Sequence, residues 1–146
     1  MANDPDKIQQ RETLDLAAWD TFVMEFGRDV ERVSDRLRGL SEARLAAAAP
    51  PLASRAKAAR ATAQTLADAA AGLEAGSDPV APPWRTLPEL IDLAAGDQLA
   101  VTGHDLLAAA QQAAPDDHAW ARDGRRTANQ VLAEAAAALA ALRRLL

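Results

Sequence analysis

The sequence contains no cysteine, no tyrosine and only two histidines. Without cysteine the chain can form neither a disulfide bond nor a thiolate metal site. β-branched residues are scarce and glycine supplies only 7 positions, so little of the chain suits strands or tight hairpins. No run of about 18 strongly apolar residues occurs, and we therefore expect no segment that spans a membrane. The polar residues 1–6 lack the apolar core of a signal peptide, which favours a cytoplasmic protein.

Basic residues are fewer than acidic ones, 16 against 21. The formal net charge is −5 and the isoelectric point is near 5.0. A nucleic-acid surface needs lysine and arginine gathered on one face, so we expect no nucleic-acid partner. Alanine, by contrast, fills 38 of the 146 positions, and it has the highest intrinsic helix propensity. Length and composition together predict a single all-α domain that covers residues 1–146.

The clearest pattern in the sequence is an apolar stripe near the N-terminus, with alternating spacings of three and four residues. Such spacing places the side chains on one face of a long helix that must bury them against other helices. It predicts a helix from about Asp6 to Leu40, with either a fresh start at Ser41 or a continuation to Ala49. The stripe consists of Trp19, Phe22, Phe26, Val30, Val33, Leu37 and Leu40.

Three further helices are predicted, at residues 51–75, 86–114 and 117–146. Between the first two of these lies a loop at 76–85, which its prolines should hold extended. Thr86 is followed three residues later by a glutamate, the spacing of a capping box, and this spacing places the start of a helix there. Four helices of similar length predict an up-down-up-down four-helix bundle with a Pro-rich loop between helices 2 and 3.

The third predicted helix carries a polar line on the arc that should face the core. Gln98, Thr102 and Asp105 fall within this arc at spacings of four and three residues. Buried polar groups need hydrogen-bond partners, so one interpretation is an internal network in which Asp105 pairs with an arginine of another helix. The other is that the line faces a cavity or a partner. Gly96 and Gly103, seven residues apart, indicate either a close approach by another helix or a break.

No motif for catalysis or metal binding is present. A di-metal bundle needs Glu-x-x-His motifs, and a zincin needs two histidines four residues apart around a glutamate. His104 and His118 satisfy neither requirement, and no serine lies in a strand-to-helix elbow. We therefore expect no metal, no cofactor and no catalytic residue, although enzymatic activity is left open.

Two hypotheses of function follow. The first is a non-enzymatic helical interaction protein that forms a homo-oligomer, a dimer above all, or docks to a partner protein. A long first helix would leave Ile8 and Leu14 uncovered in a monomer. The second is a small-molecule-binding or enzymatic bundle that uses the polar line. If a specific binding site exists, we expect it around the third helix and the loop before it, at Trp84, Gln98, Thr102, His104 and Asp105.

Overall fold

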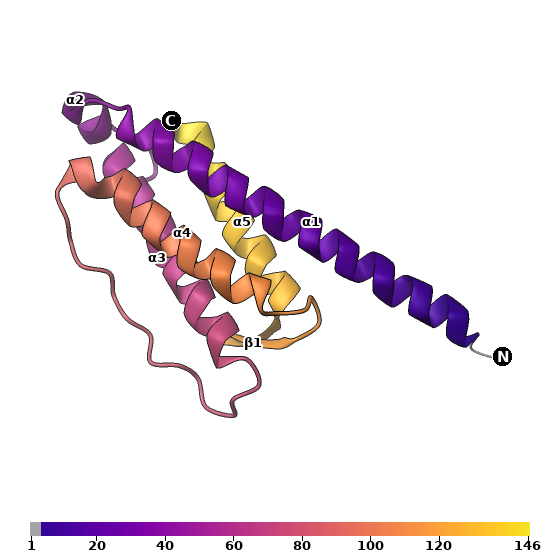
Figure 1. Cartoon of the computed structure of the whole chain (residues 1–146). Coiled ribbons are helices and arrows are strands. Elements are labelled where there is room, and N and C mark those ends of the chain that lie inside the picture. Colours follow the sequence, from indigo (N-terminus) through magenta and orange to yellow (C-terminus); the bar gives the residue numbers. More distant parts are fainter. Residues whose placement is uncertain (1–3) are drawn as a thin grey trace.

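The computed structural model of this chain describes residues 4–146, and it is mostly helical, with 69% helix and one small sheet. The predicted predominance of helix is confirmed, whereas the sheet was not expected. The long helices are α1 (Pro5–Arg38), α3 (Arg55–Ala75), α4 (Ala95–Gln111) and α5 (Ala128–Leu145). The shorter elements are α2 (Glu42–Ala46), the 3-10 turn η1 (Asp92–Ala94) and the antiparallel strands β1 (His118–Ala121) and β2 (Gly124–Thr127). Figure 1 shows their arrangement.

The long helices share one apolar core, and the predicted stripe of α1 supplies a large part of it. Trp19, Phe26 and Leu37 are almost fully buried, and the indole nitrogen of Trp19 donates a hydrogen bond of 2.9 Å to the carbonyl of Ala113. Five of the seven predicted residues of the stripe are buried, whereas Phe22 and Leu40 are half-buried and Leu40 lies beyond the end of α1. The remaining large, fully buried side chains come from all four long helices and from α2, and include Val30, Val33, Leu45, Leu66, Leu99, Leu106, Leu132, Leu139 and Leu142.

Serine side chains set where the second and third helices begin. The hydroxyl of Ser41 accepts a hydrogen bond from the amide of Arg44, and that of Ser54 accepts one from Lys57. Such caps satisfy amides that have no partner within the helix. Of the two alternatives for the first helix, the fresh start at Ser41 is therefore correct. The predicted second helix begins four residues later than expected, after Ser54.

The predicted helix start at Thr86 is wrong. Residues 76–91 form neither helix nor strand, and α4 begins only at Ala95. Leu87 precedes a proline, which disfavours helical geometry, and its amide donates to the side chain of Gln64 on α3. Its carbonyl accepts a bond from Arg60. These backbone groups thus find partners on α3, so the helix has no need to form there.

The predicted start of the last helix at residue 117 is also wrong. Residues 118–127 form the β1–β2 hairpin, and Thr127 and Gln130 cap α5 with a reciprocal capping box. The hairpin lies against α3 at Gly72, where a Cβ atom would be only 1.9 Å from the carbonyl oxygen of Trp120. Only glycine allows the strand to approach the helix so closely.

The glycines of α4 allow α1 to approach closely, as one of the two alternatives predicted. A Cβ atom at Gly103 would lie 2.4 Å from a methyl carbon of Val30, and one at Gly96 would lie 2.9 Å from the carbonyl oxygen of Ser34. These contacts also show that α1 and α4 run in opposite directions, because the later glycine meets the earlier part of α1.

The helices do not alternate in direction along the chain. The starts of α3 and α4 line one hollow, at Ala56 and Ala95, and their ends line another, at Leu73 and Ala108, so these two helices run the same way. The C-terminus of α5 lies beside the end of α1, where Arg36 donates to the Leu146 carbonyl. The up-down-up-down order is therefore corrected to up, down, down, up. In Figure 1 the segment at residues 76–91 returns along the length of α3 before α4 begins.

The N-terminal part of α1 extends beyond the other helices (Figure 1). Every residue from 4 to 18 is exposed, and Trp19 is the first buried side chain of α1. We call residues 5–18 of α1 the arm. Among the described residues, no helix is both long enough and apolar enough to cross a membrane.

Candidate functional site

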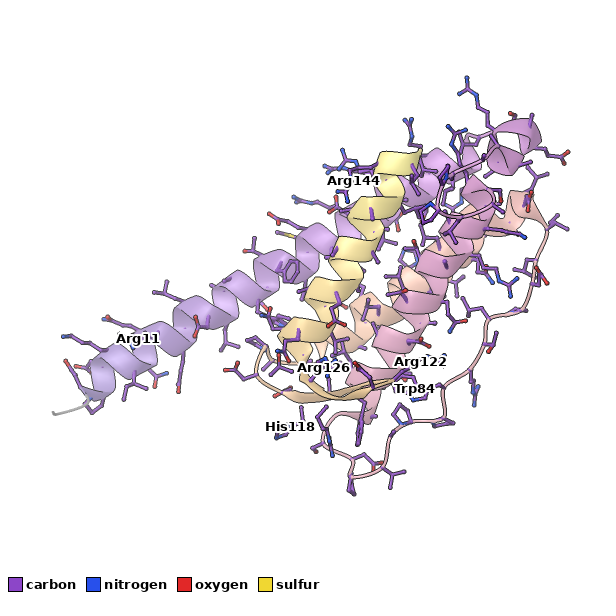
Figure 2. The ribbon with its side chains drawn as sticks, turned by 180° about the vertical axis from the view of Figure 1, so that it is seen from behind. Arg11, Trp84, His118, Arg122, Arg126 and Arg144 are labelled. Carbon is purple, nitrogen blue, oxygen red and sulfur yellow. The ribbon has the colours of Figure 1, made fainter. Side chains whose placement is uncertain are left out.

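The five residues predicted to bind a ligand or partner do not converge on one site. Trp84 lies beside the β1–β2 hairpin, half-buried, with the guanidinium of Arg122 5.5 Å from its ring centroid (Figure 2). The same guanidinium donates to the carboxylate of Asp68 on α3, at 2.6 and 3.0 Å, and this bond raises the pKa of Arg122. The tryptophan is therefore one layer of a stack that holds the loop and the hairpin to α3.

The polar line on α4 is divided between separate environments. The amide of Gln98 donates to the Pro88 carbonyl, and the buried hydroxyl of Thr102 donates to the carbonyls of Gln98 and Leu99 within its own helix. Asp105 is exposed, and no hydrogen bond or ion pair reaches it from any described residue. The expected pairing of Asp105 with an arginine is therefore wrong.

The direction of Asp105 depends on where the helix begins, and the predicted start at Thr86 is too early. A helix that began at Thr86 would include Leu90 and Ile91 in the arc that faces the core, and they would shift the centre of this arc toward Asp105. In the structure they precede α4, and their side chains are 49% and 75% exposed. The true buried face of α4 is centred near Leu99 and Leu106, which lie about 120° and 100° from Asp105 at the usual ~100° per residue.

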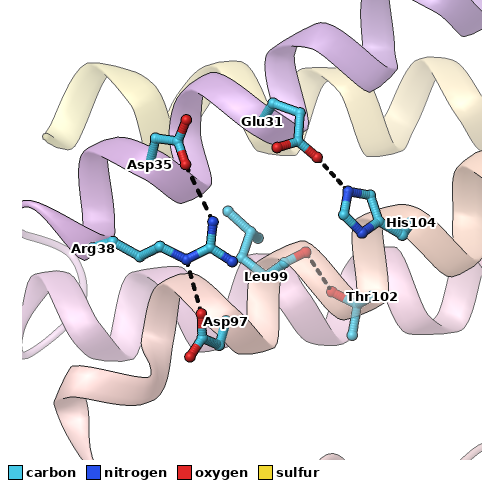
Figure 3. Close-up of polar contacts among 7 residues, drawn as sticks. All are labelled: Glu31, Asp35, Arg38, Asp97, Leu99, Thr102 and His104. Atoms are coloured by element: carbon cyan, nitrogen blue, oxygen red, sulfur yellow. Dashed lines mark hydrogen bonds and ion pairs between the residues drawn. The ribbon is translucent and has the colours of Figure 1, made fainter.

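His104 lies on the side of α4 that faces α1. Its Nε2 atom contacts the carboxylate of Glu31, and the guanidinium of Arg38 bridges Asp35 and Asp97 in the same seam (Figure 3). The hydrogen bond from Arg38 to Asp97, 2.8 Å long, raises the pKa of the guanidinium. These contacts tie α1 to α4.

Among the described residues, no three histidine, cysteine, aspartate or glutamate side chains lie close enough together to hold a metal ion. The two histidines belong to different elements, since His118 is exposed at the start of β1. The hollows of the surface are also separate. One of about 560 Å³ lies between α1 and α4 and is lined by His104, whereas Gln98 lines another of about 60 Å³.

Large apolar side chains are exposed along α1, and they lie on two different faces. The exposed fractions are 43% for Ile8, 69% for Leu14, 48% for Leu16 and 51% for Met24. At ~100° per residue, Ile8 and Leu16 continue the face that is buried further along α1. Leu14 and Met24 point to the opposite side. The exposure of Ile8 and Leu14 agrees with the sequence analysis, but the separation into two faces was missed, although the spacing of residues carries that signal.

The inner face of the arm is not a simple extension of the core. Between Ile8 and Leu16 it carries the acids Glu12 and Asp15, so a partner on this face would have to neutralise two carboxylates. The outer face carries both signs of charge around Leu14 and Met24. The arm, with the outer face that continues along α1, is the candidate interaction surface of this protein.

Comparison with known proteins brings no function to this surface. No family model matches the chain, and neither a curated protein nor a solved structure is similar to it.

Proposed function

We propose that this protein is a non-enzymatic interaction protein that associates through helices, and that the arm of α1 is the part that docks. The exposure of the whole arm carries the proposal. An isolated helix shorter than about 12–15 residues is marginally stable in water, so the arm depends on its continuity with the buried half of α1. A partner that covers the arm would both bury Leu14 and stabilise the helix. A cytoplasmic location belongs to the same proposal.

The rest of the chain suits the role of a rigid base. We interpret the four long helices as a bundle, with two of them running in the same direction, which holds the arm in a fixed orientation. The candidate polar residues favour this role over the small-molecule or enzymatic alternative. Thr102 is hydrogen-bonded within its own helix, and Gln98 and His104 line different hollows.

Hydrogen exchange and partner capture test the proposal together. The amides of residues 6–18 should exchange more slowly when the arm is covered, either by a second copy at high concentration or by a bound protein. Light scattering at the same concentrations reports self-association, and capture from the native host reports other partners. The double variant Ile8→Glu with Leu14→Glu should lose both kinds of association. Ile91→Glu is the control, because it changes an apolar side chain that is more exposed than either of these and lies far from the arm.

The proposal is wrong if the arm exchanges as an uncovered helix at every concentration and the double variant captures the same proteins as the native chain. Capture that Ile91→Glu abolishes, with the double variant unaffected, would move the docking surface to the loop before α4.

A further inference from the structure

A second stripe runs along α1 on the face turned away from the core. It follows the seven-residue spacing of a two-stranded coiled coil, in which two positions of every heptad face the partner helix, but of its eight positions only Leu14, Ala17 and Met24 are apolar. At ~100° per residue its centre lies about 180° from that of the buried stripe. It crosses from the arm into the body of α1. All of its members are exposed: Lys7, Leu14, Thr21 and Arg28 at the first position, and Gln10, Ala17, Met24 and Glu31 at the second.

This outer stripe is complementary to itself when two copies are antiparallel. With the two-fold axis at Trp19, residues equally far before and after it face each other. Leu14 then meets Met24 of the second copy, and Lys7 meets Glu31. Each contact occurs twice, as in any two-fold interface. The stripe thus places apolar groups against each other at the centre and opposite charges toward its ends.

The flanking positions are also complementary, although each pair lies two residues away from the position directly opposite. Across the same axis, Arg11 lies beside Glu25 of the second copy, and Asp4 lies beside Arg32. Ala18 lies near its own copy close to the axis, where a small side chain lets the helices approach. Exposed ion pairs contribute little affinity each, but they select orientation.

A parallel pair is disfavoured by the same charges. In that arrangement each residue faces its own copy, so Lys7 would meet Lys7, Arg28 would meet Arg28 and Glu31 would meet Glu31. The antiparallel arrangement removes these like-charged contacts and brings Lys7 to Glu31 instead. Its one repulsive contact is Asp20, which lies near its own copy beside the axis.

The shape of the molecule allows this pairing. The axis lies at Trp19, where α1 leaves the core, so the arm of one copy covers the body of α1 in the other (Figure 1). Helix α4 borders the stripe at Glu31, whose carboxylate contacts His104, so Lys7 of the second copy shares Glu31 with this histidine. The hollow of about 560 Å³ between α1 and α4 is lined by Met24, Gly27 and Leu107, and it opens beside the stripe. Leu14 of the second copy reaches Met24 at the rim of this hollow.

We propose that the protein forms a homodimer through antiparallel pairing of the outer stripes of two α1 helices. This inference rests on the proposed function and names its partner as a second copy of this chain. The stripe and its flanks involve fewer residues than the roughly 20–30 per side of a standard interface. The dimer is therefore weak and forms in a concentration-dependent way.

Sedimentation equilibrium of the full chain tests the pairing. Leu14→Glu should raise the dimer dissociation constant by more than tenfold, because it places a carboxylate against Met24 in both halves of the interface. Ile8→Glu is the matched control, since it adds the same charge to the other face of the arm, and it should change the constant less than twofold. Circular dichroism and the melting temperature at low concentration confirm that both variants fold.

A charge exchange tests the register. Arg11→Glu and Glu25→Arg should each weaken the dimer by roughly tenfold, since each replaces two attractive pairs with repulsive ones. The double variant should restore the native constant. Asp20→Asn should tighten the dimer, because it removes the like charges beside the axis.

Crosslinking tests the direction, because the chain has no cysteine of its own. A mixture of the Gln10→Cys and Arg28→Cys variants should give mixed dimers under mild oxidation, with few dimers of either variant alone. Self-crosslinked Gln10→Cys dimers would overturn the antiparallel arrangement. A dimer lost in Ile8→Glu but kept in Leu14→Glu would also overturn this inference while leaving the proposed function intact. A chain that stays monomeric at every concentration overturns it as well, and the partner-capture experiment then decides the proposed function separately.

Discussion

Ser34 is the buried polar side chain that the fold satisfies least. It has no exposed surface, and its hydroxyl oxygen has no hydrogen-bond partner in the described part of the chain. An unsatisfied buried hydroxyl costs about 1–3 kcal/mol, whereas alanine would cost little in volume there. We expect Ser34→Ala to raise the free energy of unfolding by about 1 kcal/mol, as measured by urea denaturation.

Thr102 provides the matched control for this prediction, since it is also buried but is hydrogen-bonded. Thr102→Ala should lower the free energy of unfolding by about 1–2 kcal/mol, because it removes a hydrogen bond and a buried methyl group. If both substitutions destabilise the protein equally, the hydroxyl of Ser34 has a partner after all.

Patterns that depend on a single helix could be predicted from the sequence at the level of residues. The stripe of α1 was correct because its period is a property of one helix, and the close contact at Gly103 was correct because glycine in a helix interior needs a reason. Asp105 was misplaced because its direction depends on where α4 begins, and tertiary contacts decide that start. The candidate site could not be predicted either, because tertiary contacts also decide where Trp84 lies relative to the residues of α4.

The segment between α3 and α4 shows how an element forms against its local signals. The side-chain amide of Gln64 on α3 binds this segment as the backbone of a neighbouring strand would. Its nitrogen donates to the Arg85 carbonyl at 2.9 Å, and its oxygen accepts from the Leu87 amide at 2.8 Å. Arg60 and Gln98 bind the next carbonyls. The capping box predicted at Thr86 would contribute about 1 kcal/mol to the stability of a helix. The four hydrogen bonds to this segment together contribute more. No short stretch of sequence reveals them.

Gln64 should therefore limit how readily a protease cleaves residues 85–87. We expect Gln64→Leu to accelerate tryptic cleavage after Arg85, because both hydrogen bonds to residues 85–87 are lost. Gln64→Glu keeps the acceptor for the Leu87 amide. Its cleavage rate after Arg85 should therefore lie between that of Gln64→Leu and that of the native chain. Site-resolved mass spectrometry of the digest measures the rate. Cleavage after Arg11, in the distant arm, serves as the internal control, and an unchanged rate at Arg85 would contradict the role of Gln64.

The β1–β2 hairpin could not be predicted from the sequence. Its strands have four residues each and no regular alternation of apolar and polar side chains. Two-stranded sheets are marginal by themselves, so the hairpin depends on contacts from elsewhere. Trp120 and Arg125 both donate to the Asp78 carbonyl, and Gly72 makes room for the strand. These contacts link positions more than forty residues apart.

The direction of α4 is a property of the whole molecule. α3, with 21 residues, is about 32 Å long at ~1.5 Å per residue. The segment at residues 76–91 can reach about 50 Å at ~3.3 Å per residue, so it spans the full length of α3 and returns the chain to the same end. The shorter loop expected from the sequence, 76–85, would reach only about 33 Å at the same rise, which leaves no slack for a return along α3 and makes a turn at the near end easier. The length of one irregular segment therefore separates the two topologies.

Crosslinking decides between these topologies, and the native chain offers a cysteine-free background. Lys57 and Gln98 line one hollow at the start of both helices, and Glu74 and Gln112 line another at their ends. Lys57→Cys combined with Gln98→Cys should therefore be joined by a short bismaleimide within one chain, and so should Glu74→Cys combined with Gln112→Cys.

The exchanged pairs are the controls for this last prediction. Lys57→Cys with Gln112→Cys, and Glu74→Cys with Gln98→Cys, place the two thiols at opposite ends of α3 and α4, beyond the reach of a short linker. An alternating bundle reverses the expectation, because an antiparallel α4 would bring residue 112 to the start of α3. Intramolecular products of the exchanged pairs, with none from the first two, would contradict the parallel arrangement. Peptide mapping at low protein concentration keeps contacts between copies out of the result.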